Sequence, residues 1–279
     1  MNKNISIPVA GKFFLNISDI VNKQDGFATS RLPKGFVLVS RNLELAEEAV
    51  GFGFPVVKRG IQALFPGCVE LTCERHGSIW SVTTHYLLNR VEKIQNRGNG
   101  SVGNPLFYAV KNTVAAVIRQ ASPLRDILTF ISSGLRNAFN WQTTYENTGF
   151  SVNIKMVHII DEITGKIKVE IDSTTLPGSI TEVVIMNEQG ARTFDCYQDS
   201  SGVALQGKKI GCWDEVKADS AWFFSSSQPV SFKLSQVKGS RLFRGRELVG
   251  SRLAWAGFGY SFPPRIKNFS YELEIAGVP

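Results

Sequence analysis

The feature that most constrains the fold is the alternation of apolar and polar residues in the second half of the chain. In 166–172, Ile167, Val169 and Ile171 alternate with charged residues, which is the pattern of a strand with one buried face. Beyond residue 141, similar runs recur at short intervals and are separated by Gly-, Asn- and Ser-rich turn signals. This pattern predicts an antiparallel sandwich or barrel rather than a parallel sheet.

The first half carries the helical signals. Asn104-Pro105 and Ser122-Pro123 each place a capping residue before a proline that suits a first helical turn, and apolar residues then recur at helical spacing. We therefore expect a helical pair over 104–139. A shorter stretch, 43–50, also carries helix start and stop signals.

Together these patterns predict an α+β fold that is mainly antiparallel β, a β-barrel or β-sandwich with the helical pair (104–139) packed on or in it. We favour a single domain over 1–279. The alternative is a mixed α/β region over 1–140 followed by an all-β domain over 141–279. A chain of 279 residues allows either arrangement.

Composition indicates a globular protein, with 43% hydrophobic and 20% charged residues. Polar residues interrupt the apolar residues of 5–21, so no signal-peptide core is predicted there, and we expect a cytoplasmic protein. The four cysteines form no C-x-x-C pair, which favours free thiols. The net charge of +7 comes from the first half, where the basic residues are scattered, as on a solvated face.

The known cofactor motifs are missing or out of context. Residues 98–103 match G-x-G-x-x-G, but no buried strand leads into the string and no βαβ unit follows it, so we expect a polar loop. P-loop, G-x-S-x-G and H-E-x-x-H strings do not occur. A metal site would need His85 and His158 to converge with a carboxylate, which the spacing does not demand. We expect no cofactor and no metal.

Three residues are the catalytic candidates: His85, Asp195 and Asp214. His85 shares a polar strand face with Ser81 and Thr83, which would line an interior if the apolar face packs outward. Two carboxylates in one pocket can divide acid and base roles if burial separates their pKa values. The alternative interpretation is a surface histidine and solvated loop acids.

The residues around the two acids suggest a ligand site. Aromatic rings bury ligand area, and arginine forks orient carboxylate or phosphate groups. The alternative interpretation is that these rings belong to core strands and that the arginines pair with neighbouring acids. The candidate ligand-binding residues are Tyr197, Trp213, Trp222, Arg244, Arg246 and Trp255.

The leading functional hypothesis is a β-barrel pocket that binds a mainly apolar small organic molecule, with acid–base conversion as an open extension. A second hypothesis is peripheral association with an anionic membrane surface through the basic amphipathic pair at 104–139. A third is binding of an anionic ligand or nucleic acid. Nucleic acid is the least favoured partner, because no reading module is recognisable.

Overall fold

The computed structural model describes residues 4–19, 32–40, 43–96, 141–249 and 253–277. Contacts divide the chain into one unit of 1–91 with 147–279 and a second unit of 92–146. Only the strand ends 92–96 and 141–146 of the second unit are described. The single domain over 1–279 stays a prediction.

The N-terminal residues form a small antiparallel sheet. Its strands are β1 (Asn4–Val9), β2 (Phe13–Ser18), β3 (Val37–Ser40) and β4 (Leu43–Glu44), in that spatial order. Alternate residues such as Ile7, Leu15 and Leu38 are fully buried. Period-two alternation therefore gives this sheet one face in the core.

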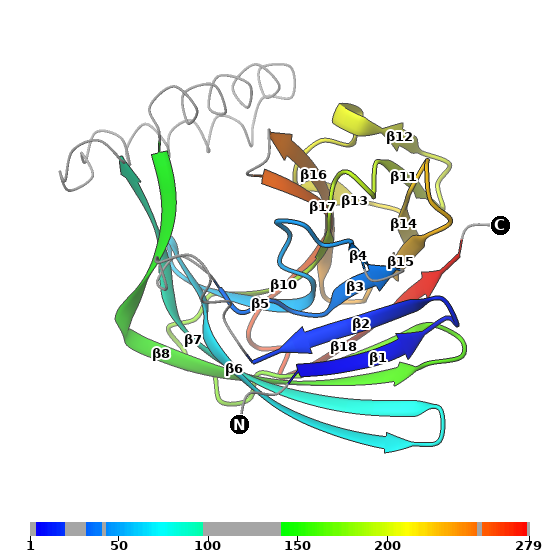
Figure 1. Ribbon diagram of the computed structural model, residues 1–279. Helices are drawn as coiled ribbons and strands as arrows, with labels where there is room; N and C mark the ends of the chain where they lie inside the picture. Colours follow the sequence, from blue (N-terminus) through cyan, green and yellow to red (C-terminus); the bar gives the residue numbers. More distant parts are fainter. Residues whose placement is uncertain (1–3, 20–31, 41–42, 97–140, 250–252, 278–279) are drawn as a thin grey trace. The chain divides into compact units, whose positions relative to one another are not determined.

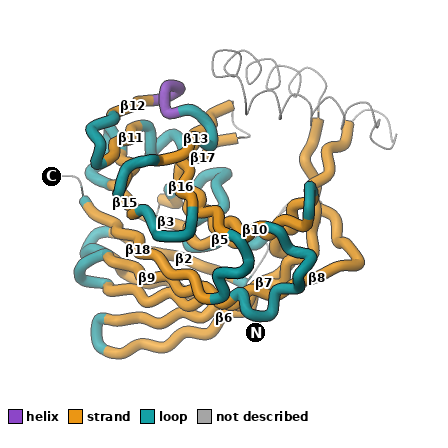
Figure 2. Tube along the Cα trace, turned by 180° about the vertical axis from the view of Figure 1, so that it is seen from behind, coloured by secondary structure: helices purple, strands orange, loops and turns teal. Residues whose placement is uncertain are grey.

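A large sheet contains the other fourteen strands of the described residues, in the order β12-β11-β14-β15-β18-β9-β8-β7-β6-β5-β10-β17-β16-β13. Figure 2 shows it from behind. The strands are β5 (Phe52–Arg59), β6 (Gln62–His76), β7 (Ile79–Asn96), β8 (Trp141–Asp161), β9 (Lys166–Asp172), β10 (Glu182–Gln189), β11 (Cys196–Asp199), β12 (Ala204–Gln206), β13 (Asp214–Val216), β14 (Ser220–Phe224), β15 (Ser231–Ser235), β16 (Arg241–Val249), β17 (Leu253–Phe262) and β18 (Asn268–Ala276).

The large sheet folds over on itself to form two facing layers (Figure 1). Phe232 of β15 contacts Phe52 of β5 and Phe258 of β17, with ring centroids 5.1 and 5.8 Å apart, although these strands are not neighbours in the sheet. Phe269 of β18 stacks on Phe262 of β17 at 4.1 Å. Edge-to-face and stacked aromatic pairs thus fill the space between the layers.

The predicted α+β class with a barrel option was wrong. The described residues are nearly all antiparallel sheet, 66% strand against 2% helix, and they form no closed barrel. The edge strands β12 and β13 are joined through the 3-10 turn η1 (Gly207–Ile210) but do not pair. The expected helical pair over 104–139 lies outside the described residues, so a pair packed on the sheet has no support.

The helix signals over 43–50 were also misleading. This segment contains β4 and then turns, with Ala49 N–H donating to the Ala46 carbonyl at 2.8 Å. Leu45, Ala46 and Ala49 are buried by packing rather than by a helical stripe. Among the described helical residues, no segment is long and apolar enough to cross a membrane.

Candidate functional site

The outward face of β10, β17 and β16 brings acids, tryptophans and glycines together. Directly opposed residues of antiparallel strands share a face. Glu188 lies opposite Gly257, which lies opposite Gly245, while Trp255 lies opposite Glu247. Phe258, the sequence neighbour of Gly257, contacts Phe232 between the two layers, so this row lies on the opposite face of the sheet. The acid–tryptophan site consists of Glu188, Trp213, Gly245, Glu247, Trp255, Gly257 and Gly259.

Two tryptophan rings stack over the glycines of this site. Trp213, in the turn before β13, stacks on Trp255 with centroids 4.8 Å apart and planes 20° from parallel. A Cβ atom at Gly245 would lie 2.7 Å from Trp255 Cη2, and one at Gly259 would lie 3.0 Å from Trp213 Cζ3. The glycines therefore leave the space that the rings occupy. Trp255 is 8% exposed, whereas Trp213 is 36% exposed and offers ring surface to a ligand.

Glu188 is the chemically unusual group of the site. It is 3% exposed, and from the described part of the chain its Oε2 accepts a long hydrogen bond, 3.5 Å, from the Val50 N–H. Burial raises the pKa of Glu188 to about 8; the Val50 N–H opposes the shift and the nearby charge of Glu247 adds to it. Glu188 therefore keeps its proton at neutral pH and can donate a hydrogen bond.

A loop from the N-terminal half holds the end of β10 in place. Glu188 N–H donates to the Gly51 carbonyl at 3.1 Å, and Gly190 N–H donates to the Leu45 carbonyl at 2.7 Å. The Glu47 carboxylate accepts from Arg192 N–H at 3.2 Å and pairs with its guanidinium. The segment that carried misleading helix signals thus clamps the strand that carries Glu188.

Of the predicted ligand-binding residues, Trp213 and Trp255 lie in this site, and Tyr197 and Arg244 lie together elsewhere. The Arg244 guanidinium sits 4.7 Å from the Tyr197 ring centroid and donates to the Ile210 carbonyl at 3.2 Å. Its Nη2 lies 3.9 Å from Oδ2 of Asp214, a predicted catalytic residue. Tyr197 is fully buried and donates to Asp199 at 2.8 Å, and burial raises the pKa of its hydroxyl. These contacts hold β11, η1, β13 and β16 together.

Asp195 and Arg246 hold backbone segments in place. Asp195 accepts from the Ser226 N–H at 2.8 Å and hydroxyl at 2.7 Å. Partial burial opposes its ionisation, but these bonds outweigh that cost and hold the pKa of Asp195 below its ordinary value. Arg246 donates to the carbonyls of Ala191 at 2.7 Å and Phe194 at 3.3 Å.

His85 and Trp222 lie on other strands of the large sheet. His85 is exposed on β7 opposite Glu70 of β6. Five strands, β8, β9, β18, β15 and β14, separate β7 from β11, which follows Asp195. Trp222 is half-buried on β14, between Gln198 and Lys233. The sheet order places neither residue beside the acid–tryptophan site.

Sequence reasoning missed Glu188 and Glu247. Glu188 falls in 187–190, whose composition resembles a turn, yet it ends a buried strand. An acid two residues after the apolar run 183–186 was the available signal. Glu247 is one of the neighbouring acids with which the arginines were expected to pair. Within the described ranges, no group of three or more His, Cys, Asp or Glu side chains is placed to hold a metal ion.

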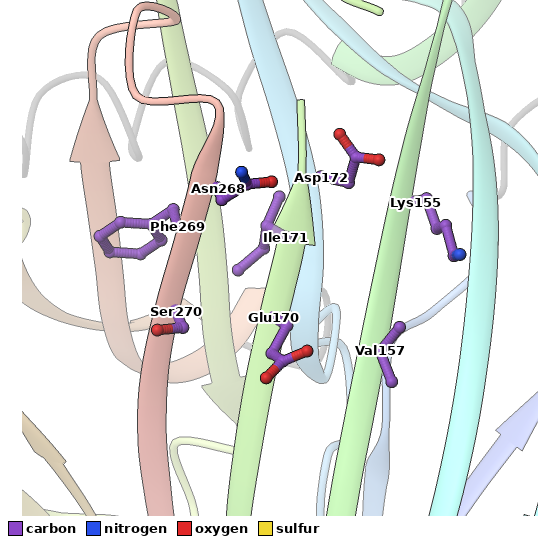
Figure 3. Close-up of a pocket in the computed structure, with 8 residues that line it drawn as sticks. All are labelled: Lys155, Val157, Glu170, Ile171, Asp172, Asn268, Phe269 and Ser270. Atoms are coloured by element: carbon purple, nitrogen blue, oxygen red, sulfur yellow. The ribbon is translucent and has the colours of Figure 1, made fainter. Parts of the chain in front are cut away.

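A second, polar hollow of about 390 Å³ lies on β8, β9 and β18. Figure 3 shows Asp172 between Lys155 and Asn268, and Glu170 between Val157 and Ser270. Both acids of this hollow already have partners within the protein. Glu170 pairs with Lys168 at 2.7 Å, and hydrogen bonds from the Thr174 hydroxyl and N–H hold the pKa of Asp172 below its ordinary value. This hollow is therefore a weaker candidate than the acid–tryptophan site.

Comparison with known proteins gives a likeness of fold. No protein-family model and no curated protein matches the sequence. The structure resembles the α-N-acetylgalactosaminidase NagBb from Bifidobacterium bifidum, with a TM-score of 0.51 at 8% identity over 98% of this chain and 36% of that chain. Its GalNAc complex gives a TM-score of 0.50 at 9% identity, with the same coverage.

The chain thus spans about a third of the length of NagBb and shares the fold of that part. A galactose mutarotase-like protein from Lactobacillus casei aligns over 98% of this chain and 99% of its own length, at 9% identity, with a TM-score of 0.40.

Proposed function

We propose that the protein binds a carbohydrate at the acid–tryptophan site. A sugar ring presents an apolar C–H face and a rim of hydroxyl groups. The exposed ring of Trp213 suits the apolar face, while protonated Glu188 offers a donor and Glu247 lies on the same face as an acceptor. The observation that carries the proposal is the stacked Trp213–Trp255 pair beside a buried carboxylic acid.

The likeness to NagBb supports this proposal, because part of an enzyme named for an amino sugar has the same fold. Fold alone does not assign a ligand, so the proposal depends on the site. The proposed ligand differs from the mainly apolar molecule expected from the sequence, because a sugar has an apolar face and a polar rim. Binding at an anionic membrane surface, or of nucleic acid, stays a prediction from the sequence.

The acid pair also supports an acid–base conversion of the bound sugar. Glu188 and Glu247 lie on the same sheet face as Trp255, and a carboxyl group that keeps its proton at neutral pH, as Glu188 does, can act as a general acid. Detection of a reaction product tests this second proposal. Incubation with the sugar that binds should give a new or interconverted species by NMR, and Glu188→Gln should abolish it while binding persists.

The binding proposal is tested by titrating N-acetylgalactosamine, galactose and mannose into wild type, Trp213→Ala and Trp222→Ala by calorimetry. We expect at least one sugar to bind wild type. Trp213→Ala should weaken that binding about tenfold, since an aromatic platform contributes on the order of 1–1.5 kcal/mol.

Trp222→Ala is the matched control, because Trp222 is a partly accessible tryptophan that lies away from this site, on β14. It should bind as wild type does. Sugar binding that survives Trp213→Ala and is lost with Trp222→Ala would place the ligand elsewhere, and no binding of any sugar would remove the proposal.

A further inference from the structure

Between the layers lies a cluster of buried polar side chains that the acid–tryptophan site does not use. It contains His158 of β8, Asn187 of β10, Tyr86 of β7 and Tyr271 of β18, all 3% exposed or less. His158 and Tyr271 both lie opposite Val169 of β9, on its two sides, so they share a face of the sheet. We call this group the polar chamber.

The orientation of the Asn187 amide is fixed by its neighbours. Its Oδ1 accepts from the Gly53 N–H at 3.0 Å and from the Tyr271 hydroxyl at 2.8 Å. A backbone N–H can only donate, so the oxygen must face Gly53 and the Nδ2 amino group must point the other way. That amino group is buried and has no hydrogen-bond partner within the described part of the chain.

His158 and Tyr86 also have buried polar atoms that lack a good hydrogen-bond partner. Both ring nitrogens of His158 and the hydroxyl of Tyr86 are buried and make no hydrogen bond of normal geometry to a described residue, although the Val82 backbone and the Thr84 side chain lie close enough to influence their pKa values. Burial lowers the pKa of His158 to about 4, although the backbone of Val82 opposes the shift. The ring is therefore neutral and needs one acceptor and one donor. Its Nε2 faces Gly53, where a Cβ atom would lie only 2.5 Å away.

Four polar atoms without a hydrogen bond of normal geometry in one buried cluster are uncommon in a folded protein. Leaving each one unpaired carries a desolvation cost, and a group that both donates and accepts would satisfy the mixture of N–H, O–H and lone pairs present here. We propose that the polar chamber is a binding site for ordered water, which hydrogen-bonds to His158, Asn187 and Tyr86. The inference is independent of any carbohydrate at the outer face.

A crystal structure at about 1.5 Å tests this directly. We expect ordered solvent density within hydrogen-bond distance of Asn187 Nδ2 and of one His158 ring nitrogen. An empty chamber, or direct bonds among the four groups, would overturn the proposal.

A second measurement uses the sign of a melting-temperature change. In a hydrated chamber, Tyr86→Phe removes a bonded hydroxyl and should lower the melting temperature by a few degrees. In a dry chamber the same change removes an unsatisfied group and should raise it. Tyr260→Phe is the control, because the Tyr260 hydroxyl donates to the Ser235 carbonyl at 2.5 Å, and its loss should lower the melting temperature in either case.

Discussion

Replacing Gly257 by alanine is expected to destabilise the protein by ~3 kcal/mol or more. A Cβ atom at this position would lie 2.1 Å from the Asn187 carbonyl oxygen and 2.7 Å from Glu188 Cα. Both atoms belong to the backbone of β10, so no side-chain rotation can relieve the overlap. The strands β10 and β17 would have to separate along their pairing from Val183 to Gln189.

Gly178→Ala is the matched control for this prediction. A Cβ atom at Gly178 would meet nothing within 4 Å, so the substitution should change stability by less than about 0.5 kcal/mol. Urea unfolding followed by tryptophan fluorescence measures both variants. Equal midpoints for Gly257→Ala and Gly178→Ala would show that β10 and β17 are not in this close contact.

The sequence was sufficient to predict the antiparallel strands but not how they are arranged. Alternation in 166–172 is a local property, and β9 has that pattern of buried and exposed residues. The contact between Phe232 and Phe258 depends on which non-neighbouring strands face each other, which no local pattern specifies. The 43–50 segment shows the same limit, because capping signals were overridden by packing against the end of β10.

Only part of the site could be predicted, because its assembly also depends on which strands are adjacent. Trp213 and Trp255 were selected as aromatic residues in a strand-rich region, but their stacking requires β13, β16 and β17 to be adjacent. Glu188 was missed because turn composition and the end of a buried strand look alike in sequence. Its raised pKa follows from burial, which appears only when β10 is paired and clamped by the loop at 45–51.

The pH dependence of folding should reveal Glu188 most clearly. Its folded pKa of about 8 lies above the ordinary value of 4.5. Below pH 4.5 the carboxyl is protonated in both states, and its full contribution to stability is present. As pH rises toward 8 the unfolded chain gives up the proton while the folded protein keeps it, so stability falls by at most about 5 kcal/mol in total.

His158 changes stability in the opposite direction at lower pH. Its folded pKa of about 4 lies below the ordinary value of 6.5, so its contribution is present above pH 6.5 and is lost as pH falls toward 4. The two effects oppose each other between pH 4.5 and 6.5. Above pH 6.5, Glu188 is the one of these two groups whose ionisation still changes stability. We therefore expect the free energy of unfolding to decline from pH 6.5 to 8.

Glu188→Gln should remove that decline, because an amide does not ionise. The variant should be more stable than wild type at pH 8, by up to about 5 kcal/mol, and the difference should shrink toward zero near pH 4.5. Urea unfolding at pH 5, 6.5 and 8 gives the comparison. Parallel stability profiles for wild type and Glu188→Gln would mean that Glu188 ionises normally in the folded protein.

Glu182 on the same strand provides a control, because its ionisation should change stability with pH in the opposite direction. Burial opposes its ionisation, but Lys58 and Ser261 outweigh that effect and hold the pKa of Glu182 below its ordinary value. Its contribution to stability is therefore present above the ordinary pKa and is lost in acid. Glu182→Gln should be less stable than wild type at neutral pH, with the deficit shrinking as pH falls. Opposite shifts from two glutamates on β10 would separate the effect of burial from any general effect of removing a negative charge.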